Sequence, residues 1–148
     1  MRKVLLALAA SVAVASPALA NEGRVEARGG VIWSGGSSEA TAGVAAGYDY
    51  DLGTSGFFGA EVSADKVLVS GSDAYFGLTA RGGIKAGTNG KVFVAGGYTV
   101  GEGEDVPHLG AGYEHKLGSS IYLKGEYRHF FSDFVDGDAV SAGIGIKF

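Results

Sequence analysis

Several features that constrain other proteins are missing from this sequence of 148 residues. There is no cysteine, so neither a disulfide nor a thiolate metal site is possible. Beyond residue 20, no apolar run reaches the roughly 20 residues that a membrane-spanning helix needs. Lysine and arginine form no cluster, and the formal net charge is -4, which argues against nucleic acid as a partner.

The N-terminus has the pattern of a secretory signal peptide. Residues 1–3 are a short basic start, residues 4–15 are uncharged and apolar, and residues 17–20 supply small side chains at cleavage-site spacing. We expect cleavage after Ala20, which leaves a mature chain of residues 21–148 with a net charge of -6. The alternative, a membrane anchor, is disfavoured because the run is short, rich in alanine and interrupted by Pro17.

The mature chain is rich in glycine and alternates between polar and apolar side chains with period two, which predicts β-strands. It is one domain by length. Each predicted strand is about as long as a tilted transmembrane strand. The predicted strands are residues 24–33, 40–52, 56–66, 74–86, 91–100, 107–117, 120–130 and 139–148.

One face of most of these strands carries charge of both signs. In the seventh segment Tyr122, Lys124 and Glu126 share a face, and Ile121 and Leu123 share the other. Phe93 interrupts the polar face of the fifth segment, so its phase stays open. The charged faces predict an ion network that comprises Glu26, Arg28, Asp49, Glu61, Asp65, Arg81, Lys85, Glu114, Lys116, Lys124, Glu126 and Arg128.

Alternation alone does not say which face points inward, so a soluble β-protein is the alternative to a membrane barrel. Three details favour charge inside. Glycine accompanies the charges and would leave room for long side chains in a narrow lumen. The apolar face is rich in alanine and glycine, which would pack a soluble core poorly. Aromatic residues gather near the segment ends, where membrane girdles lie; they are Trp33, Tyr48, Tyr50, Phe58, Phe76, Tyr98, Tyr127 and Phe148.

The connections alternate in length. Those near residues 53–55, 87–90 and 118–119 are short and carry turn residues. The others, near residues 34–39, 67–73, 101–106 and 131–138, are somewhat longer, as expected of extracellular loops. The predicted extracellular acidic residues are Glu102, Glu104, Asp105, Asp133, Asp136 and Asp138.

The C-terminus carries a resemblance. In the last segment Val140, Ile144, Ile146 and Phe148 share one face, and the chain ends on that aromatic residue. Together with the stretch at residues 123–129 and the eight segments, it resembles the small outer-membrane barrels of the opacity and OmpA-like group of Gram-negative bacteria. The resemblance implies an all-β fold: an eight-stranded antiparallel up-and-down transmembrane β-barrel. It also implies a location in the outer membrane, contact with membrane lipid and lipopolysaccharide, and Phe148 as the signal read by the barrel-assembly machinery.

Few residues suggest chemistry. His108, His115 and His129 lack metal-ligand spacing. Some small barrels resemble lipid A-modifying enzymes with a His and a Ser two positions apart, but His129 and Ser132 are three apart and fall on different faces. Residues 133–138 offer carboxylates that suit calcium, without EF-hand spacing. We therefore predict no catalytic residue, no metal and no cofactor.

These observations predict a structural role in envelope integrity and surface properties. Eight strands leave an interior that side chains fill, so a wide pore is disfavoured. An adhesin or ligand-binding barrel that uses the acidic loops to contact a host or surface ligand is the alternative, with Phe134 as the one aromatic anchor in the loops. A lipid A-modifying enzyme is the third and weakest hypothesis.

Overall fold

The computed structural model describes residues 21–101 and 104–148. The predicted signal peptide, residues 1–20, and Glu102 lie outside the described residues. Within the described part of the chain, no helix is long and apolar enough to cross a membrane.

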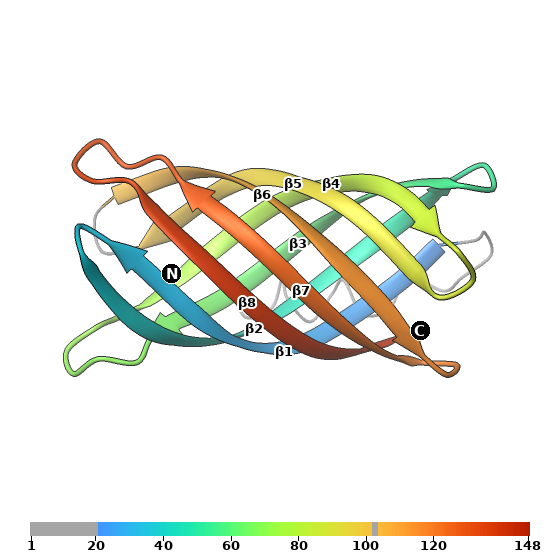
Figure 1. Ribbon diagram of the computed structural model, residues 1–148, viewed down its shortest axis with the longest axis horizontal. Coiled ribbons are helices and arrows are strands. Elements are labelled where there is room, and N and C mark those ends of the chain that lie inside the picture. Colours follow the sequence, from blue (N-terminus) through green and yellow to red (C-terminus); the bar gives the residue numbers. More distant parts are fainter. Residues whose placement is uncertain (1–20, 102–103) are drawn as a thin grey trace, which may run out of the picture.

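Eight strands form one closed sheet in which each strand pairs with the next and β8 pairs with β1 (Figure 1). All pairs are antiparallel, so the barrel has up-and-down topology. The strands are β1 (Asn21–Ser34), β2 (Ser37–Leu52), β3 (Gly56–Val67), β4 (Ala74–Ala86), β5 (Gly90–Gly101), β6 (Glu104–Leu117), β7 (Ile121–Phe130) and β8 (Gly137–Lys147). This confirms the predicted fold class.

The strand bounds differ from the predicted ones by at most three residues. The main differences are at the starts of β1, β2 and β6, each of which begins three residues before its predicted start, and the starts of β2 and β6 lie at the longer connections. In consequence the β1–β2 connection is only residues 35–36, and the loops are shorter than the sequence indicated. In β1 burial alternates from Arg24 to Trp33 but not over the added residues at its start, and near the start of β2 most side chains are exposed.

The two ends of the barrel differ. The turns after β2, β4 and β6 lie at the right-hand end in Figure 1, together with the C-terminus. Each begins with a glycine at positive φ, Gly53, Gly87 or Gly118, a conformation that other residues rarely adopt. The longer connections lie at the opposite end. We call these the turn side and the loop side.

The apolar face of every strand points outward. Side chains such as Val44, Leu78, Val94 and Ile144 are exposed along the middle of the barrel wall. Burial of apolar side chains in the interior is small and centres on the cluster Phe57, Phe93 and Ala95. The barrel is therefore apolar outside and polar inside, the reverse of a soluble domain.

Aromatic side chains mark both edges of this outer wall. Near the turn side Tyr50 stacks on Phe58 with ring centroids 5.1 Å apart, and Tyr48 meets Tyr50 edge-on at 5.0 Å. Near the loop side Trp33, Phe76 and other aromatic rings are exposed. Amphipathic rings favour the two interfaces of a bilayer, so their placement suits a membrane-embedded wall.

Candidate functional site: the charged interior

The interior of the barrel holds the charged residues that the sequence placed on one face. Nine of them are buried, and Arg28, Lys85 and Lys116 are half-buried, the last two near the turn side. The buried ones are Glu26, Asp49, Glu61, Asp65, Arg81, Glu114, Lys124, Glu126 and Arg128.

Glu61 on β3 is the hub of the loop-side half of the interior. Its carboxylate lies 2.6 Å from Arg24 Nη1, 3.1 Å from Arg28 Nη1 and 3.3 Å from Lys124 Nζ. Arg128 Nη2 is a further 3.7 Å contact. A carboxylate taken out of water is costly unless opposite charges surround it, and Glu61 has such partners from β1 and β7.

Two further ion pairs extend this half. Arg28 holds Asp65 through two nitrogens, with Nε 2.7 Å from Oδ1 and Nη2 2.5 Å from Oδ2. This bidentate geometry is the strong form of an Arg–carboxylate pair. Arg128 pairs with Glu126, which lies two residues away on the same face of β7, and its Nε and Nη2 both contact the same oxygen, Oε1.

Lys124 links the middle of the interior. Its Nζ lies 2.6 Å from Glu26 Oε1 and 3.2 Å from Glu126 Oε2. The Tyr122 hydroxyl donates to the other oxygen of Glu26 at 2.9 Å. Lys124 therefore joins β7 to β1 across a strand that lies between them, β8.

In the turn-side half, Arg81 on β4 lies between two carboxylates. Its guanidinium pairs with Asp49 on β2 and with Glu114 on β6, the second at 3.1 Å. Lys147 also pairs with Glu114, and Lys91 lies 3.4 Å from Asp49. These contacts tie five strands together through side chains alone.

Two aromatic rings fill the space beside Arg81. The centre of its guanidinium lies 5.4 Å from the Phe57 ring centroid and 5.0 Å from that of Phe93. Cation–π attraction of this kind strengthens when the groups are shielded from water. Phe93 therefore points inward with Lys91 and Ala95, which settles the phase of the fifth strand.

Glycines make room for the network. A Cβ built on Gly47 would lie 2.6 Å from Arg24 Nη2, and one built on Gly145 would lie 2.6 Å from the Tyr122 ring. Such distances are far inside van der Waals contact, so a larger residue would displace these side chains. The glycines of the inward face are therefore required by the space that the charged side chains occupy.

His108 is the one histidine buried inside the barrel in the part that the structure describes. Thr79 Oγ1 lies 3.0 Å from Nε2, and Thr99 Oγ1 lies 3.0 Å from Nδ1. Both ring nitrogens are thus occupied by neutral hydroxyls of β4 and β5. Among the described residues, no group of three potential ligands has the geometry of a metal site.

A short turn that sets Leu117 opposite Ile121 predicts, by counting back along both strands, that Glu114 faces Lys124 and that Gly112 faces Glu126. The structure has this register. Residues that face each other in this way would be expected to form an ion pair between Glu114 and Lys124. The ion pair expected from that register is wrong. Glu114 pairs with Arg81 and Lys147, whereas Lys124 pairs with Glu26, Glu61 and Glu126. The side chains of Glu114 and Lys124 thus pair with residues on non-adjacent strands across the lumen, and not with each other along the wall.

The predicted ion network omitted some charged residues that face the interior. Arg24 and Lys147 have the inward parity of β1 and β8 but lie near predicted segment ends, and Lys91 was obscured by the open phase of its strand. Parity was the signal that could have found them. The missed ionic residues are Glu22, Arg24, Asp51, Lys91 and Lys147.

The acidic residues of the loop side are mostly at the surface. Asp105, Asp133 and Asp136 are exposed. The prediction that Asp138 is a loop residue is wrong, because Asp138 lies in β8. The Tyr127 hydroxyl donates a hydrogen bond to its carboxylate, and His129 Nδ1 lies 2.8 Å from it. His129 also meets Phe131 edge-on at 4.6 Å, beside the aromatic edge of the wall.

Phe148 lies at the seam between β8 and β1. Its backbone N–H donates to the Gly23 carbonyl and its carbonyl accepts from the Gly23 N–H, both at 2.9 Å. The ring is 55% exposed on the outer wall at the turn side. The last residue thus adds one more pair to the ladder that closes the barrel.

No protein-family model matches this chain, and neither does any curated protein sequence. Solved structures do match. The N-terminal β-barrel domain of Pseudomonas aeruginosa OprF shares 15% identity with a TM-score of 0.59, over 84% of this chain and 97% of that one. Neisserial surface protein A shares 15% identity with a TM-score of 0.57, over 86% and 97%.

The attachment invasion locus protein Ail of Yersinia pestis has a TM-score of 0.61 at 13% identity, over 86% of this chain and 97% of Ail. At such identities the likeness shows the fold. The chain therefore has the architecture of the small eight-stranded outer-membrane β-barrels, as the resemblance of its C-terminal segments implied.

Proposed function

We propose that this protein is an integral outer-membrane β-barrel with a plugged lumen, which contributes to envelope integrity and to the surface properties of the cell. The observation that carries the proposal is the separation of the two faces. The outer wall is apolar with aromatic edges, and the inner wall is a network of ion pairs. Such a wall is stable only where lipid covers the outside.

The same network supports a plugged lumen. Large side chains including Arg24, Tyr122, Phe57 and Phe93 are almost completely buried inside. Most interior cations and carboxylates that the structure describes form ion pairs with one another, which leaves little unpaired charge along the middle of the barrel to guide ions. Eight-stranded barrels have an interior just wide enough to be filled by side chains. The proposal therefore assigns no general diffusion to this protein.

Planar-bilayer recording tests the lumen. Purified mature protein, refolded in detergent and inserted into the bilayer, should give no steady conductance, while a general porin in the same apparatus serves as a positive control. A stable, wide channel would replace the structural role with transport. Deletion of the gene should in parallel increase permeability of the envelope to dyes that intact cells exclude.

Phe148 supports a second part of the proposal, that the C-terminal residue directs assembly. Deleting it removes the exposed ring and both backbone hydrogen bonds to Gly23. Surface protease accessibility should disappear for the truncated chain and remain for Phe148→Tyr, which keeps an aromatic ring. Normal insertion of the truncated chain would contradict this role.

The loop side favours an adhesin as the second candidate. Phe134 is 87% exposed, and Leu68 and Val69 are exposed on another loop at the same end. Ail has been solved in complex with the heparin analogue sucrose octasulfate, which is a polyanion. Here the acidic loops disfavour such a ligand and favour a cationic one.

Binding to immobilised cationic and anionic surfaces separates the two candidates. An adhesin of this kind should bind the cationic surface and lose binding in Phe134→Ser, with Val94→Ser, on the lipid-covered wall, as the matched control. Equal binding by wild type and Phe134→Ser would rule out the adhesin, and the structural role would be the one remaining candidate.

A further inference from the structure

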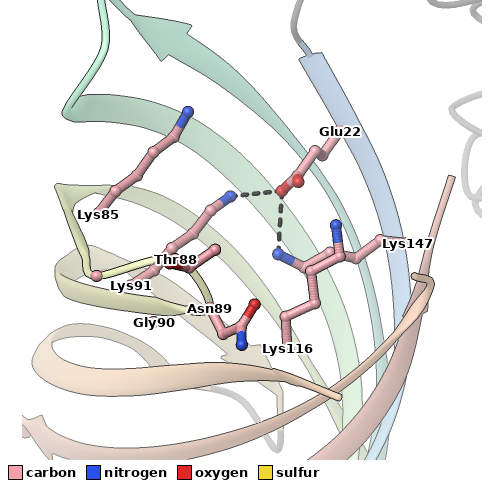
Figure 2. Close-up of a pocket in the computed structure, with 9 residues that line it drawn as sticks. Glu22, Lys85, Thr88, Asn89, Gly90, Lys91, Lys116 and Lys147 are labelled. Atoms are coloured by element: carbon pink, nitrogen blue, oxygen red, sulfur yellow. Dashed lines mark hydrogen bonds and ion pairs between the residues drawn. The ribbon is translucent and has the colours of Figure 1, made fainter. Parts of the chain in front are cut away.

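The turn-side mouth of the barrel holds a cavity of about 150 Å³. Four lysines from four strands line it: Lys85, Lys91, Lys116 and Lys147. Glu22 of β1 is the one carboxylate among the lining residues, and the turn at residues 87–90 forms part of the rim. Figure 2 shows the lysine side chains around Glu22, with Lys91 and Lys147 joined to it.

Positive charge exceeds negative charge at this mouth. Lys91 and Lys147 share one oxygen of Glu22, at 2.5 and 3.0 Å. Lys85 pairs with Asp51 at 2.6 Å. Lys116 forms no ion pair with any residue that the structure describes. Lys91 also contacts Asp49, and Lys147 also contacts Glu114, deeper in the barrel. Both of these carboxylates already form an ion pair with Arg81.

The backbone holds three of these lysines at equivalent places around the rim. The N–H of Lys85 donates to the Ser55 carbonyl at 2.7 Å, that of Lys116 to Asn89 at 2.8 Å, and that of Lys147 to Ser120 at 2.7 Å. Each lysine therefore lies near the end of a strand that returns to the turn side, fixed to the neighbouring turn. The Cα positions are preorganised, which lowers the cost of gathering the ammonium groups around a ligand.

We propose that this mouth binds a phosphate group. The cavity is large enough to hold several water molecules, which is room for a compact tetrahedral oxyanion. Lysine ammonium groups act as point charges that bind phosphate without a fixed fork geometry. Thr88 and Asn89 of the rim add neutral donors to the same cavity. Free inorganic phosphate and the phosphate of a lipid headgroup share this chemistry.

The test uses the mature barrel in a non-ionic, phosphate-free detergent at low salt. Inorganic phosphate is titrated and binding is measured by calorimetry and by phosphorus NMR line broadening. Lys116→Gln should weaken binding about tenfold, which corresponds to about 1.4 kcal/mol, because it removes one charge-assisted hydrogen bond to the phosphate. Lys116→Arg should bind within about threefold of wild type. Lys66→Gln is the matched control, because Lys66 is exposed near the loop side and should leave binding unchanged.

Glu22→Gln adds a result of the opposite sign. It removes the carboxylate that competes with phosphate for Lys91 and Lys147, so binding should tighten about tenfold. A general loss of folding could only weaken binding in both variants. Absence of phosphate binding by the wild type, or equal affinity in wild type, Lys116→Gln and Glu22→Gln, would overturn the proposal.

A second titration with glycerol 3-phosphate distinguishes the two sources. Binding at least as tight as that of inorganic phosphate assigns a lipid headgroup, and clearly weaker binding assigns free phosphate. The proposal concerns the mouth of the folded barrel and does not depend on the structural or adhesive role. A conducting or adhesive barrel would therefore leave this result unaffected.

Discussion

The interior and the loop side of this barrel contain the same kinds of acidic side chain in opposite settings. Inside, Glu61 contacts Arg24, Arg28, Lys124 and Arg128. At the loop side the carboxylates are mostly exposed, and every lysine and arginine of the described residues except Lys66 faces the interior. Position relative to the barrel wall thus decides whether a carboxylate is paired or solvated.

The difference teaches where charge contributes to stability. In a site shielded from water, an unpaired charge is costly and a paired one is strongly coupled to its neighbours. An exposed charge is solvated and screened, so it contributes little to folding and stays available to other molecules. Substitutions of one residue type should therefore have very different effects in the two regions.

The largest effect is expected for Glu61→Ala. The substitution leaves Arg24 and Lys124 without their shared carboxylate in the interior, and breaking a buried pair costs about 3–5 kcal/mol. Urea unfolding in detergent micelles, followed by tryptophan fluorescence, measures the loss. Glu61→Gln, which keeps the shape and removes the charge, is the control. A loss under about 1 kcal/mol would indicate that water penetrates the interior.

A charge on the outer wall should cost almost as much. Val94 is 63% exposed near the middle of β5, with its side chain on the apolar face. Val94→Lys should destabilise the barrel by about 2–4 kcal/mol in lipid vesicles, because lysine would lie in the hydrocarbon. Leu68→Lys, on a loop, should change stability little. Equal tolerance of both substitutions would contradict a lipid-covered wall.

A double-mutant cycle examines the ion network itself. Lys124 contacts Glu26 at 2.6 Å, whereas Glu114 lies opposite Lys124 in the ladder and pairs elsewhere. The Lys124/Glu26 cycle should give a coupling free energy of about 1–3 kcal/mol and the Lys124/Glu114 cycle about 0.5 kcal/mol or less. The reverse order would show that pairing follows the ladder instead of crossing the lumen.

The smallest effect is expected at the loop side. Glu39 is exposed near the start of β2. Glu39→Ala should change the free energy of unfolding by less than about 0.5 kcal/mol, as exposed substitutions usually do. The same urea unfolding assay applies. A loss comparable to that of Glu61→Ala would remove the contrast between the two regions.

Sequence periodicity predicted the strands and their inward faces because both depend on local parity. The β4 segment was predicted with its observed bounds, and the register of β6 on β7 follows from a short turn. The partners of Lys124 and Glu114 could not be predicted in this way. They lie on non-adjacent strands, and which side chains meet across the lumen depends on how the whole sheet closes.

Phe93 shows a second limit. Its apolar ring interrupts a polar pattern, and periodicity alone therefore left the phase of its strand open. In the barrel the ring lies inside beside Phe57, against the Arg81 guanidinium. An aromatic ring is compatible with a charged interior when a cation covers its face, and that partner comes from a different strand.

The pairing of β1 with β8 has a consequence for how the protein is made. Gly23 and Phe148 are hydrogen-bonded at the seam although almost the whole barrel sequence separates them. Until the final strand has been synthesised, a growing sheet has two edges with unpaired backbone groups, which invite aggregation. Contacts between such distant segments also form slowly. The topology therefore favours a route in which the chain is kept unfolded, for example by a chaperone, until β8 is available to pair with β1.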